Sequence, residues 1–530
     1  MRWTSNGIVA LIILVSVVVL GAGLRFYKLD RIPRGLNCDE AAMGYDAYSL
    51  LKTGRDLHGR YMPWLMKSHD EDYLEPMHTY LTVPVVALFA LNVFAVRFLP
   101  ALVGTLTVLT AYLLAKELFD RRTGLLAAFL VAVSPWDLQF SRIAFRGIFL
   151  PLFVTLALFF FLRGLKRSSY LVACGAAFGL ALYTYSVAKA FVPLTLVALA
   201  LMYFRELREM LRRSASARRH LMAAAATFII LAAPMYYLAF FGKEQGKFSQ
   251  ISVFNDPEPA YQFLVNFFKH LSPNFLFTEG EADSFLHFGQ VLLVLAPFIA
   301  FALYVGIKED KKSCALAVIL FLIGIVPAAL TNRGIPHPLR SIGSVPFLEL
   351  LAAFGLVYFY DRLATRRYSL KIPALAVVAG LLLWNCVAYV HAYFVRYPVL
   401  SETWFEFGLQ DAIAYTEKHR DEYNGFVLTK TIREGYVFPL FFAKLDPSQY
   451  HKRGRMGKYI TWEQYSRDPL LRKGRNLYIV SLARARFDED VQAFADKYKD
   501  AVRFRAGKCF VIDPSVLPAA EVPVPGGKSP

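Results

Sequence analysis

The chain has 530 residues, 56% of them hydrophobic, and its mean hydropathy is +0.39. Soluble globular proteins are nearer to about 45–50% apolar, so this composition excludes an ordinary soluble enzyme as well as a disordered or small secreted chain. Lys and Arg number 59 against 41 Asp and Glu, which gives a net charge of +18. The charged residues are clustered between long apolar runs, so the excess of basic residues is explained by loops between membrane spans. We therefore expect no nucleic-acid partner.

The long apolar runs predict membrane-spanning helices. About 17–25 apolar residues in a helix cross the hydrocarbon core of a bilayer, and Gly7–Leu24 is the first such run. Arg2 precedes it and no small-residue cleavage site follows, so we interpret the run as an anchor and not as a removed signal peptide. We expect eleven spans, the others beginning near Phe98, Gly124, Gly147, Ser168, Ala190, Leu221, Phe288, Ser313, Ser341 and Ile372.

One further apolar run, Thr79–Val96, is ambiguous. With eleven spans, the short loops on one side of the membrane carry 19 Lys and Arg, and the short loops on the other side carry five. Cytoplasmic loops are enriched in these residues, and a twelfth span at Thr79 would place all 19 outside. We therefore expect a cytoplasmic N-terminus and an interfacial or re-entrant helix at Thr79–Leu91, which Pro84 interrupts.

Large segments between and after the spans then lie on the extracytoplasmic side of the membrane. They are an outer loop 25–78, a second outer loop 242–287 and the tail 396–530. The tail is typical of a small α/β domain, with short buried strands at Phe426–Leu428 and Leu477–Val480 and an amphipathic helix at Phe405–Glu417. We therefore predict a polytopic α-helical membrane domain, 1–395, followed by an extracytoplasmic α/β domain, 396–530.

Asp39 and Glu40 in the first outer loop are the candidate catalytic residues. They follow the first span and begin a helix-like stretch, Ala41–Leu51. Negative charge is favoured near the N-terminus of a helix, which suits a general base that must accept a proton. The alternative is that the pair simply caps a surface helix, which is the commoner situation for an arbitrary Asp-Glu pair.

Five cations mark the outer ends of the spans. Arg142 and Arg146 lie in SRIAFRG, Lys189 lies in YSVAKAF, and Arg333 and Arg340 lie in TNRGIPHPLRS. A cation at the centre of a membrane helix costs about 2.5–3.5 kcal/mol, so such residues either have a task or snorkel to the surface. Since Arg binds phosphate with paired hydrogen bonds, we expect this group to hold the phosphate of a donor on the side of the Asp-Glu pair.

Other polar residues on that side are candidate substrate ligands. We expect Glu75, His78, His337 and His287 to contact substrate. Acidic residues beside His287 suit a divalent metal or sugar hydroxyls, or are simply solvated, so metal use stays open. The sequence has no Walker loop, no paired CxxC and no HExxH motif, so neither ATP hydrolysis nor zinc proteolysis has support.

The order of these motifs resembles that of a known family. A first span is followed by Asp39-Glu40, by Glu75-Pro76, and by FAVRFLPALVGTLTVLTAYLLAKELFDRRTGLLAAFLVAVSPW as second and third spans. SRIAFRGIFLPLF then stands where relatives carry a Ser-Arg motif. Over Ile8–Phe204 the chain is similar to membrane glycosyltransferases of the C-type (GT-C) fold, within the group of dolichyl-phosphate-mannose–protein mannosyltransferases and lipid A aminoarabinose transferases (families 39 and 83).

This resemblance implies a function. Such enzymes transfer a sugar from a polyprenyl-phosphate donor to an acceptor at the outer membrane face, with inversion in a single displacement. Asp39 matches the family's base and Glu40 its acidic neighbour. The chain departs from the family's pattern at two points: relatives often carry Lys-Pro-Pro or His-Pro-Pro where this chain has Glu75-Pro76-Met77-His78, and some carry an acid where Arg146 stands.

The expectation is therefore an inverting hexosyl- or pentosyltransferase in the bacterial inner (plasma) membrane, in contact with membrane lipids. Its acceptor is a protein, a lipid or a glycan, and the sequence leaves the sugar, the acceptor and the oligomeric state open. Two other hypotheses remain. One is a lipid or sugar transporter or flippase, and the other is a membrane scaffold whose outer domain binds a partner.

Overall fold

The computed structural model describes residues 7–68, 73–242, 246–280, 286, 288–366, 368–454, 456–472, 474–482 and 488–517. The chain divides into two compact units. Unit 1 comprises Met1–Tyr27, Asp70–His78 and Pro100–Tyr393, and unit 2 comprises Lys28–His69, Thr79–Leu99 and Phe394–Pro530. Parts of the first outer loop therefore group with the C-terminal segment, and the division into domains 1–395 and 396–530 stays a prediction.

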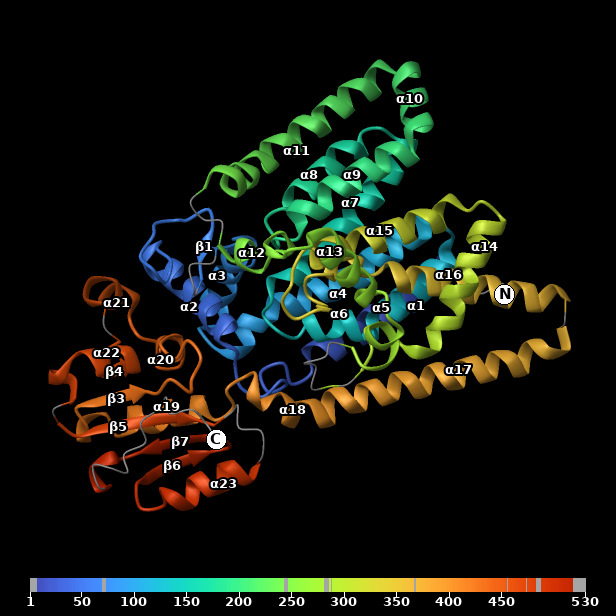
Figure 1. Cartoon of the computed structure of the whole chain (residues 1–530). Coiled ribbons are helices and arrows are strands. Elements are labelled where there is room, and N and C mark those ends of the chain that lie inside the picture. Colours follow the sequence, from blue (N-terminus) through green and yellow to red (C-terminus); the bar gives the residue numbers. More distant parts are fainter. Residues whose placement is uncertain are drawn as a thin grey trace. The chain divides into compact units, whose positions relative to one another are not determined.

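Unit 1 is built of helices. Within it, α8 packs against both α7 and α11 (Figure 1). Helices α3 (Met77–Phe89) and α4 (Val93–Leu118) each contain a boundary between the units. The other helices are α1 (Gly7–Phe26), α5 (Arg121–Ala132), α6 (Pro135–Phe140), α7 (Phe149–Lys166), α8 (Tyr170–Ala181), α9 (Ala188–Met202), α10 (Phe204–Arg213), α11 (Ala215–Phe241), α12 (Gly246–Ile251), α13 (Pro259–His270), α14 (Ala296–Lys308), α15 (Lys312–Ala329), α16 (Phe347–Arg366) and α17 (Tyr368–His391).

Many of these helices are long and apolar enough to cross a membrane. Seven qualify among the described residues, and α9 with α10, bent by 72°, makes an eighth if the pair is one span. The remaining three expected spans correspond to helices of 12 or 13 residues, α5, α8 and α14. Helix α3 also has only 13 residues and contains Pro84. A multi-pass helical membrane protein is therefore confirmed, while the count of eleven spans stays a prediction.

Unit 2 contains a five-stranded sheet in the order β4-β3-β5-β7-β6. Strand β3 pairs in parallel with β4 and β5, and β7 pairs antiparallel with β5 and β6 (Figure 1). The strands are β3 (Gly425–Leu428), β4 (Tyr459–Thr461), β5 (Asn476–Ser481), β6 (Val502–Ala506) and β7 (Cys509–Ile512). Two further short strands lie outside this sheet, β1 (Met66–Lys67) in unit 2 and β2 (Tyr73–Leu74) in unit 1. The sheet confirms the predicted α/β character of the C-terminal segment.

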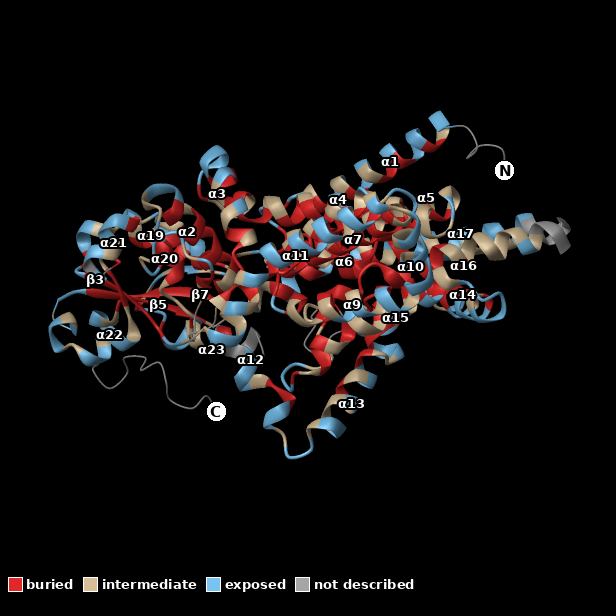
Figure 2. Ribbon diagram, turned by 90° about the horizontal axis from the view of Figure 1, so that it is seen from above, coloured by how far each residue is buried: buried red, intermediate tan, exposed pale blue. Residues whose placement is uncertain are grey.

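The central strands are buried throughout because helices cover both faces of the sheet. Every residue of β3, β5 and β7 is buried, and Figure 2 shows these strands in the colour of buried residues. On one face, Val427 and Phe510 share a core with Val491 of α23 (Asp488–Lys497). On the other face, the hydroxyls of Tyr459 and of Thr416 in α19 (Leu409–Lys418) are hydrogen-bonded. Strands buried on both faces read as continuous apolar runs, which is why they were visible in the sequence.

The other helices of unit 2 are short apart from α2, which carries the Asp-Glu pair. Helix α2 packs against α20 and α21. At Gly44 of α2 an added Cβ would lie 2.6 Å from the ring of Phe441 in α20, so a side chain there would require that ring to move. These helices are α2 (Cys38–Thr53), α18 (Tyr397–Leu400), α20 (Val437–Phe442), α21 (Pro447–Arg453) and α22 (Trp462–Arg467).

Candidate active site

The Asp-Glu pair stands in the first turn of α2, and its two members have different roles. Asn37 is the N-cap, and its side chain accepts from the backbone N–H of Asp39 at 2.9 Å. Glu40 completes the capping box, since its Oε2 accepts from the backbone N–H of Asn37 at 3.1 Å. A capping box satisfies two backbone donors that have no partner inside the helix. Glu40 therefore fixes where α2 begins, whereas the Asp39 side chain is half-buried.

Glu40 is also held by Arg97, a residue that the sequence analysis missed. Nε of Arg97 lies 2.9 Å from Oε1 of Glu40, and both side chains are fully buried. The same guanidinium donates to the carbonyls of Leu29, Pro33 and Gly35. The pair therefore ties the chain that leads into α2 to the start of α4. An arginine inside the apolar run FAVRFLP was the signal that pointed to it.

A second charged cluster lies in unit 1, around Glu75. Oε1 of Glu75 accepts from Nζ of Lys189 at 2.8 Å, and Oε2 accepts from Nε of Arg146 at 3.1 Å. Glu75 is 1% exposed. Burial raises the pKa of this carboxyl, but the Lys189 and Arg146 charges outweigh burial and hold the pKa below its ordinary value of 4.5. Among the described residues, this cluster therefore joins one buried carboxylate to two cations.

Aromatic rings and His78 surround this cluster. Arg146 lies over the ring of Tyr185, 5.2 Å from its centroid, where a cation is attracted by the π face. His78 is buried and meets Phe149 edge-on at 5.5 Å. Burial, with a smaller contribution from Arg146, lowers the pKa of His78 to about 3, so its imidazole adds no charge at neutral pH.

Arg142 lies in the same SRIAFRG segment but has other partners. Its Nη1 donates to the carbonyls of Leu24 and Arg25, and its Nη2 donates to that of Tyr27, all at 2.8 Å. The end of α1 leaves such carbonyls without partners inside the helix. Arg142 thus fastens the C-terminal end of α1, and its expected contact with donor phosphate stays a prediction.

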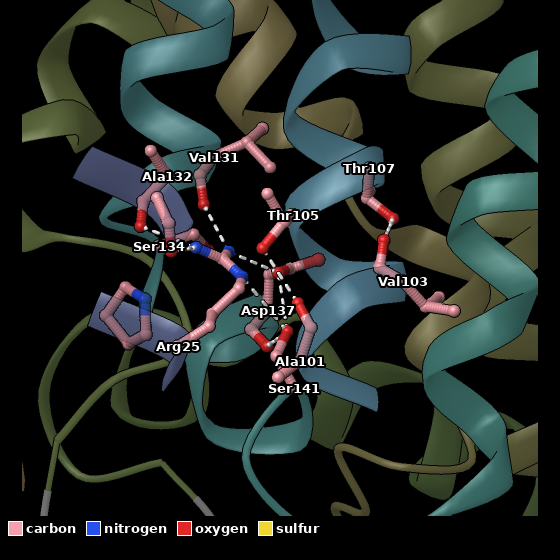
Figure 3. Close-up of polar contacts among 12 residues, drawn as sticks. Arg25, Ala101, Val103, Thr105, Thr107, Val131, Ala132, Ser134, Asp137 and Ser141 are labelled. Atoms are coloured by element: carbon pink, nitrogen blue, oxygen red, sulfur yellow. Dashed lines mark hydrogen bonds and ion pairs between the residues drawn. The ribbon is translucent and has the colours of Figure 1, made fainter. Parts of the chain in front are cut away.

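Arg25 and Asp137 form a fully buried ion pair. The sequence analysis did not predict this pair. Figure 3 shows the guanidinium of Arg25 directed at Asp137 and Ser141 and at the carbonyls of Val131 and Ala132. The donor–acceptor distance from Arg25 to Asp137 is 2.5 Å. This pair joins α1 to α6, and Arg25 also donates to Ser141 of the Ser-Arg motif directly after α6.

The remaining cations lie in the loop between α15 and α16. Nη1 of Arg340 donates to Oγ1 of Thr331 at 3.0 Å and to the carbonyl of Arg333. The backbone N–H of Arg340 donates to Nδ1 of His337 at 3.3 Å. Arg333 itself is exposed. The structure therefore brings Arg333, His337 and Arg340 together in one loop of unit 1.

The metal question involves the second outer loop. His287 and most of the acidic residues near it lie outside the described residues. Among the residues that are described, no three His, Cys, Asp or Glu side chains are grouped as metal ligands would be.

Asp39 and Glu40 belong to unit 2, and the five expected phosphate ligands belong to unit 1.

Comparison with known proteins shows the fold. Residues 74–237 match the family model of dolichyl-phosphate-mannose-protein mannosyltransferase. The structure of apo ArnT from Cupriavidus metallidurans is similar with a TM-score of 0.56 and 15% identity, over 95% of this chain and 97% of ArnT. The same enzyme bound to undecaprenyl phosphate gives a TM-score of 0.56 and 16% identity, over 96% and 98%. No curated protein sequence matches the chain. The resemblance and the C-type glycosyltransferase fold expected from the sequence are thereby confirmed.

Proposed function

We propose that this chain is an integral-membrane glycosyltransferase that moves a sugar from a polyprenyl-phosphate donor to an acceptor hydroxyl. One observation carries the proposal. The segment that matches the mannosyltransferase family model, 74–237, lies within a chain whose fold follows ArnT over 95% of its length. That segment contains Glu75, Arg146 and Lys189, the charged cluster in which one buried carboxylate holds two cations. These findings lend no support to the transporter or flippase alternative.

Asp39 is the proposed general base. In an inverting displacement the acceptor oxygen attacks the anomeric carbon, the bond from that carbon to the phosphate oxygen breaks, and the acceptor proton passes to a base. Asp39 is half-buried in the first turn of α2, where the positive end of the helix dipole faces a carboxylate. Glu40 is engaged by Arg97 and Asn37. These contacts support Glu40 as the residue that positions the first turn of α2, and Asp39 in the same turn as the base.

Lys189 and Arg146 are the proposed ligands of the donor phosphate. Negative charge grows on the phosphate as the glycosidic bond breaks, and preorganised cations stabilise that charge without rearranging. Glu75 fixes both cations from a buried position, and their side chains remain 24% and 16% exposed. Arg333 and Arg340 on their loop are further proposed phosphate ligands. Arg142 is the remaining proposed phosphate ligand, and its hydrogen bonds to carbonyls at the end of α1 fix its position.

Transfer of label from a panel of radiolabelled polyprenyl-phosphate sugars to membrane extracts tests the activity. Hexose and pentose donors both belong in the panel, since the proposal covers either. Asp39→Asn should abolish transfer and leave the melting temperature and the binding of polyprenyl phosphate as in the wild type. Asp30→Asn is the matched control, because Asp30 is an exposed carboxylate in the same loop. Full activity of Asp39→Asn would refute the assignment of the base.

The proposed location is the bacterial inner membrane, with a cytoplasmic N-terminus and the C-terminal segment outside. The support is the asymmetry of Lys and Arg among the short loops. A cysteine at exposed Gly454, at the end of α21, would report the extracytoplasmic side. A cysteine beside Lys308, at the end of α14, would report the cytoplasmic side. A membrane-impermeant maleimide added to intact spheroplasts should label the first and spare the second.

A further inference from the structure

Helix α13 (Pro259–His270) in unit 1 is polar on its buried side and apolar on its exposed side. Asn266 and His270 are 1% and 0% exposed, whereas Tyr261, Leu264 and Phe268 are 64%, 52% and 64% exposed. Exposed residues along this helix are visible in Figure 2. A helix on the surface of a soluble protein has the opposite arrangement. The exposed side of α13 is therefore suited to an apolar environment and not to water.

The buried side has specific polar partners. Nδ2 of Asn266 donates to the carbonyl of Thr331 at 2.8 Å. Nε2 of His270 accepts from the backbone N–H of His337 at 2.9 Å, and its Nδ1 lies 2.8 Å from the carbonyl of Asn266. Burial lowers the pKa of His270 to about 4, which keeps the imidazole neutral with Nε2 as an acceptor. These bonds fix which side of α13 faces inward, so the apolar side cannot turn in.

The position of α13 along the membrane normal follows from the same contacts. Asn266 also approaches the carbonyl of Ala329, the last residue of the α15 span, and Thr331 follows two residues later. Helix α13 is thus held where a span ends. Its 12 residues are about 18 Å long, too short to cross a bilayer of about 30 Å. A short helix at that level with one apolar side is typical of an interfacial helix.

We propose that α13 lies in the lipid–water boundary at the end of α15, with Tyr261, Leu264 and Phe268 in contact with lipid. The occupant of its apolar side is the bilayer, because the surface continues from the end of a membrane span and carries aromatic rings, which are enriched at membrane interfaces. Lys269, exposed at the next position, faces water.

This placement has a consequence that rests on the proposed function. The polar side of α13 holds the loop from Thr331 to Arg340, which carries Arg333, His337 and Arg340. Anchoring α13 in lipid therefore sets the depth of that loop at the membrane surface. A lipid-linked phosphate lies at the same depth, so α13 positions the two arginines for the donor headgroup.

Nitroxide accessibility of the full chain in lipid nanodiscs tests the placement without any measurement of activity. All five native cysteines are buried, so single Leu264→Cys, Phe268→Cys and Lys269→Cys variants can be labelled, with labelled wild type as background. We expect a ratio of oxygen to nickel-chelate collisions several-fold higher at 264 and 268 than at 269. Equal ratios at 268 and 269 would place α13 in water and overturn the proposal. Dipolar broadening between labels at 268 would reveal a second copy there and would overturn it equally.

Hydrogen exchange tests the link from α13 to the loop. Phe268→Glu should withdraw the helix from lipid and increase exchange of backbone amides between 331 and 340 several-fold, and Lys269→Glu is the matched control without such an effect. Should Phe268→Glu fail to fold, Phe268→Ala gives the same comparison with a smaller loss of lipid contact. Unchanged exchange would refute the link. Because neither measurement depends on sugar transfer, failure of the proposed function would leave both results interpretable.

Discussion

Arg97 and Glu40 form a two-point ion pair with both side chains fully buried. Nε of Arg97 reaches Oε1 of Glu40 at 2.9 Å, and Nη2 reaches Oε2 at 3.0 Å. Oε2 also accepts from the backbone N–H of Asn37. The carboxylate of Glu40 thus completes the N-terminal cap of α2 and also balances the charge of the buried Arg97 guanidinium. The direction in which α2 presents Asp39 depends on this arrangement.

Glu40→Gln should destabilise unit 2. Removing one partner of a buried ion pair leaves the other charge uncompensated, which typically costs about 3–5 kcal/mol. We therefore expect a marked drop in the melting temperature of the purified protein in detergent. Asp30→Asn, which removes an exposed carboxylate elsewhere in unit 2, serves as control and should change the melting temperature little. A Glu40→Gln protein as stable as the wild type would contradict the structural role.

Glu75→Gln separates two roles of Glu75 by the sign of its effect. If Glu75 only competed with phosphate, removing its charge would tighten the binding of polyprenyl phosphate. If it positions Lys189 and Arg146, as the buried geometry indicates, binding should weaken about tenfold, which corresponds to about 1.4 kcal/mol. Equilibrium binding of undecaprenyl phosphate measures this.

Undecaprenol is the control ligand for Glu75→Gln, because it has the same tail and no phosphate. Its affinity should be the same for both proteins. Glu75→Asp keeps the charge but shortens the side chain by one methylene, so we expect it to give an intermediate loss. Tighter binding of the phosphate by Glu75→Gln would show that Glu75 does not position the cations.

Arg25 and Asp137 should be strongly coupled. Either Arg25→Met or Asp137→Asn alone leaves a buried group without its charged partner, and each should lower the free energy of unfolding by about 3–5 kcal/mol. The double variant removes both charges and should cost less than the sum of the two. A double-mutant cycle of unfolding free energies measures the coupling, and additive effects would contradict a direct pair.

Asp46 in α2 makes the stability of unit 2 depend on pH. Burial raises the pKa of its carboxyl to about 8, while the backbone N–H of Leu57, which donates to it at 2.7 Å, opposes the shift. The folded chain therefore keeps a proton that the unfolded chain releases near pH 4. Stability associated with Asp46 is full below that pH and is lost as pH rises toward 8.

Asp46→Asn tests this dependence, since an amide stays neutral and can accept the same hydrogen bond. The melting temperature of the variant should rise relative to that of the wild type between pH 5 and pH 8. Asp30→Asn, an exposed acid, should follow the wild type over this range. A constant difference between Asp46→Asn and the wild type would show that Asp46 does not titrate there.

Local features of the structure were accessible from the sequence. The strands at 426–428 and 477–480 lie within β3 and β5, because strands buried on both faces read as apolar runs. The helix expected at Ala41–Leu51 lies within α2, which begins three residues earlier at Cys38, where the cap at Asn37 involves residues only three apart in the chain. Most expected spans were found as long apolar helices for a similar reason, since hydropathy is a property of one continuous segment.

Partnerships between distant residues could not be predicted. Glu75 meets Arg146 and Lys189 across 71 and 114 positions of the chain, and Arg97 meets Glu40 across 57. The sequence indicated that these residues were charged and near the membrane, but not which would be paired. It equally left open which member of the Asp-Glu pair caps the helix and pairs with Arg97.

Composition, hydropathy and the order of motifs therefore determined that the chain is a polytopic membrane protein with a C-type glycosyltransferase fold. Periodicity and hydropathy act over a few residues, and they persist in any arrangement of the helices. Only the tertiary structure decided that Glu40 compensates Arg97, that Glu75 holds two cations, and that α13 buries its polar side. Each of these depends on the cost of burying a charge or a polar group without a partner, and that cost arises only once distant segments pack together.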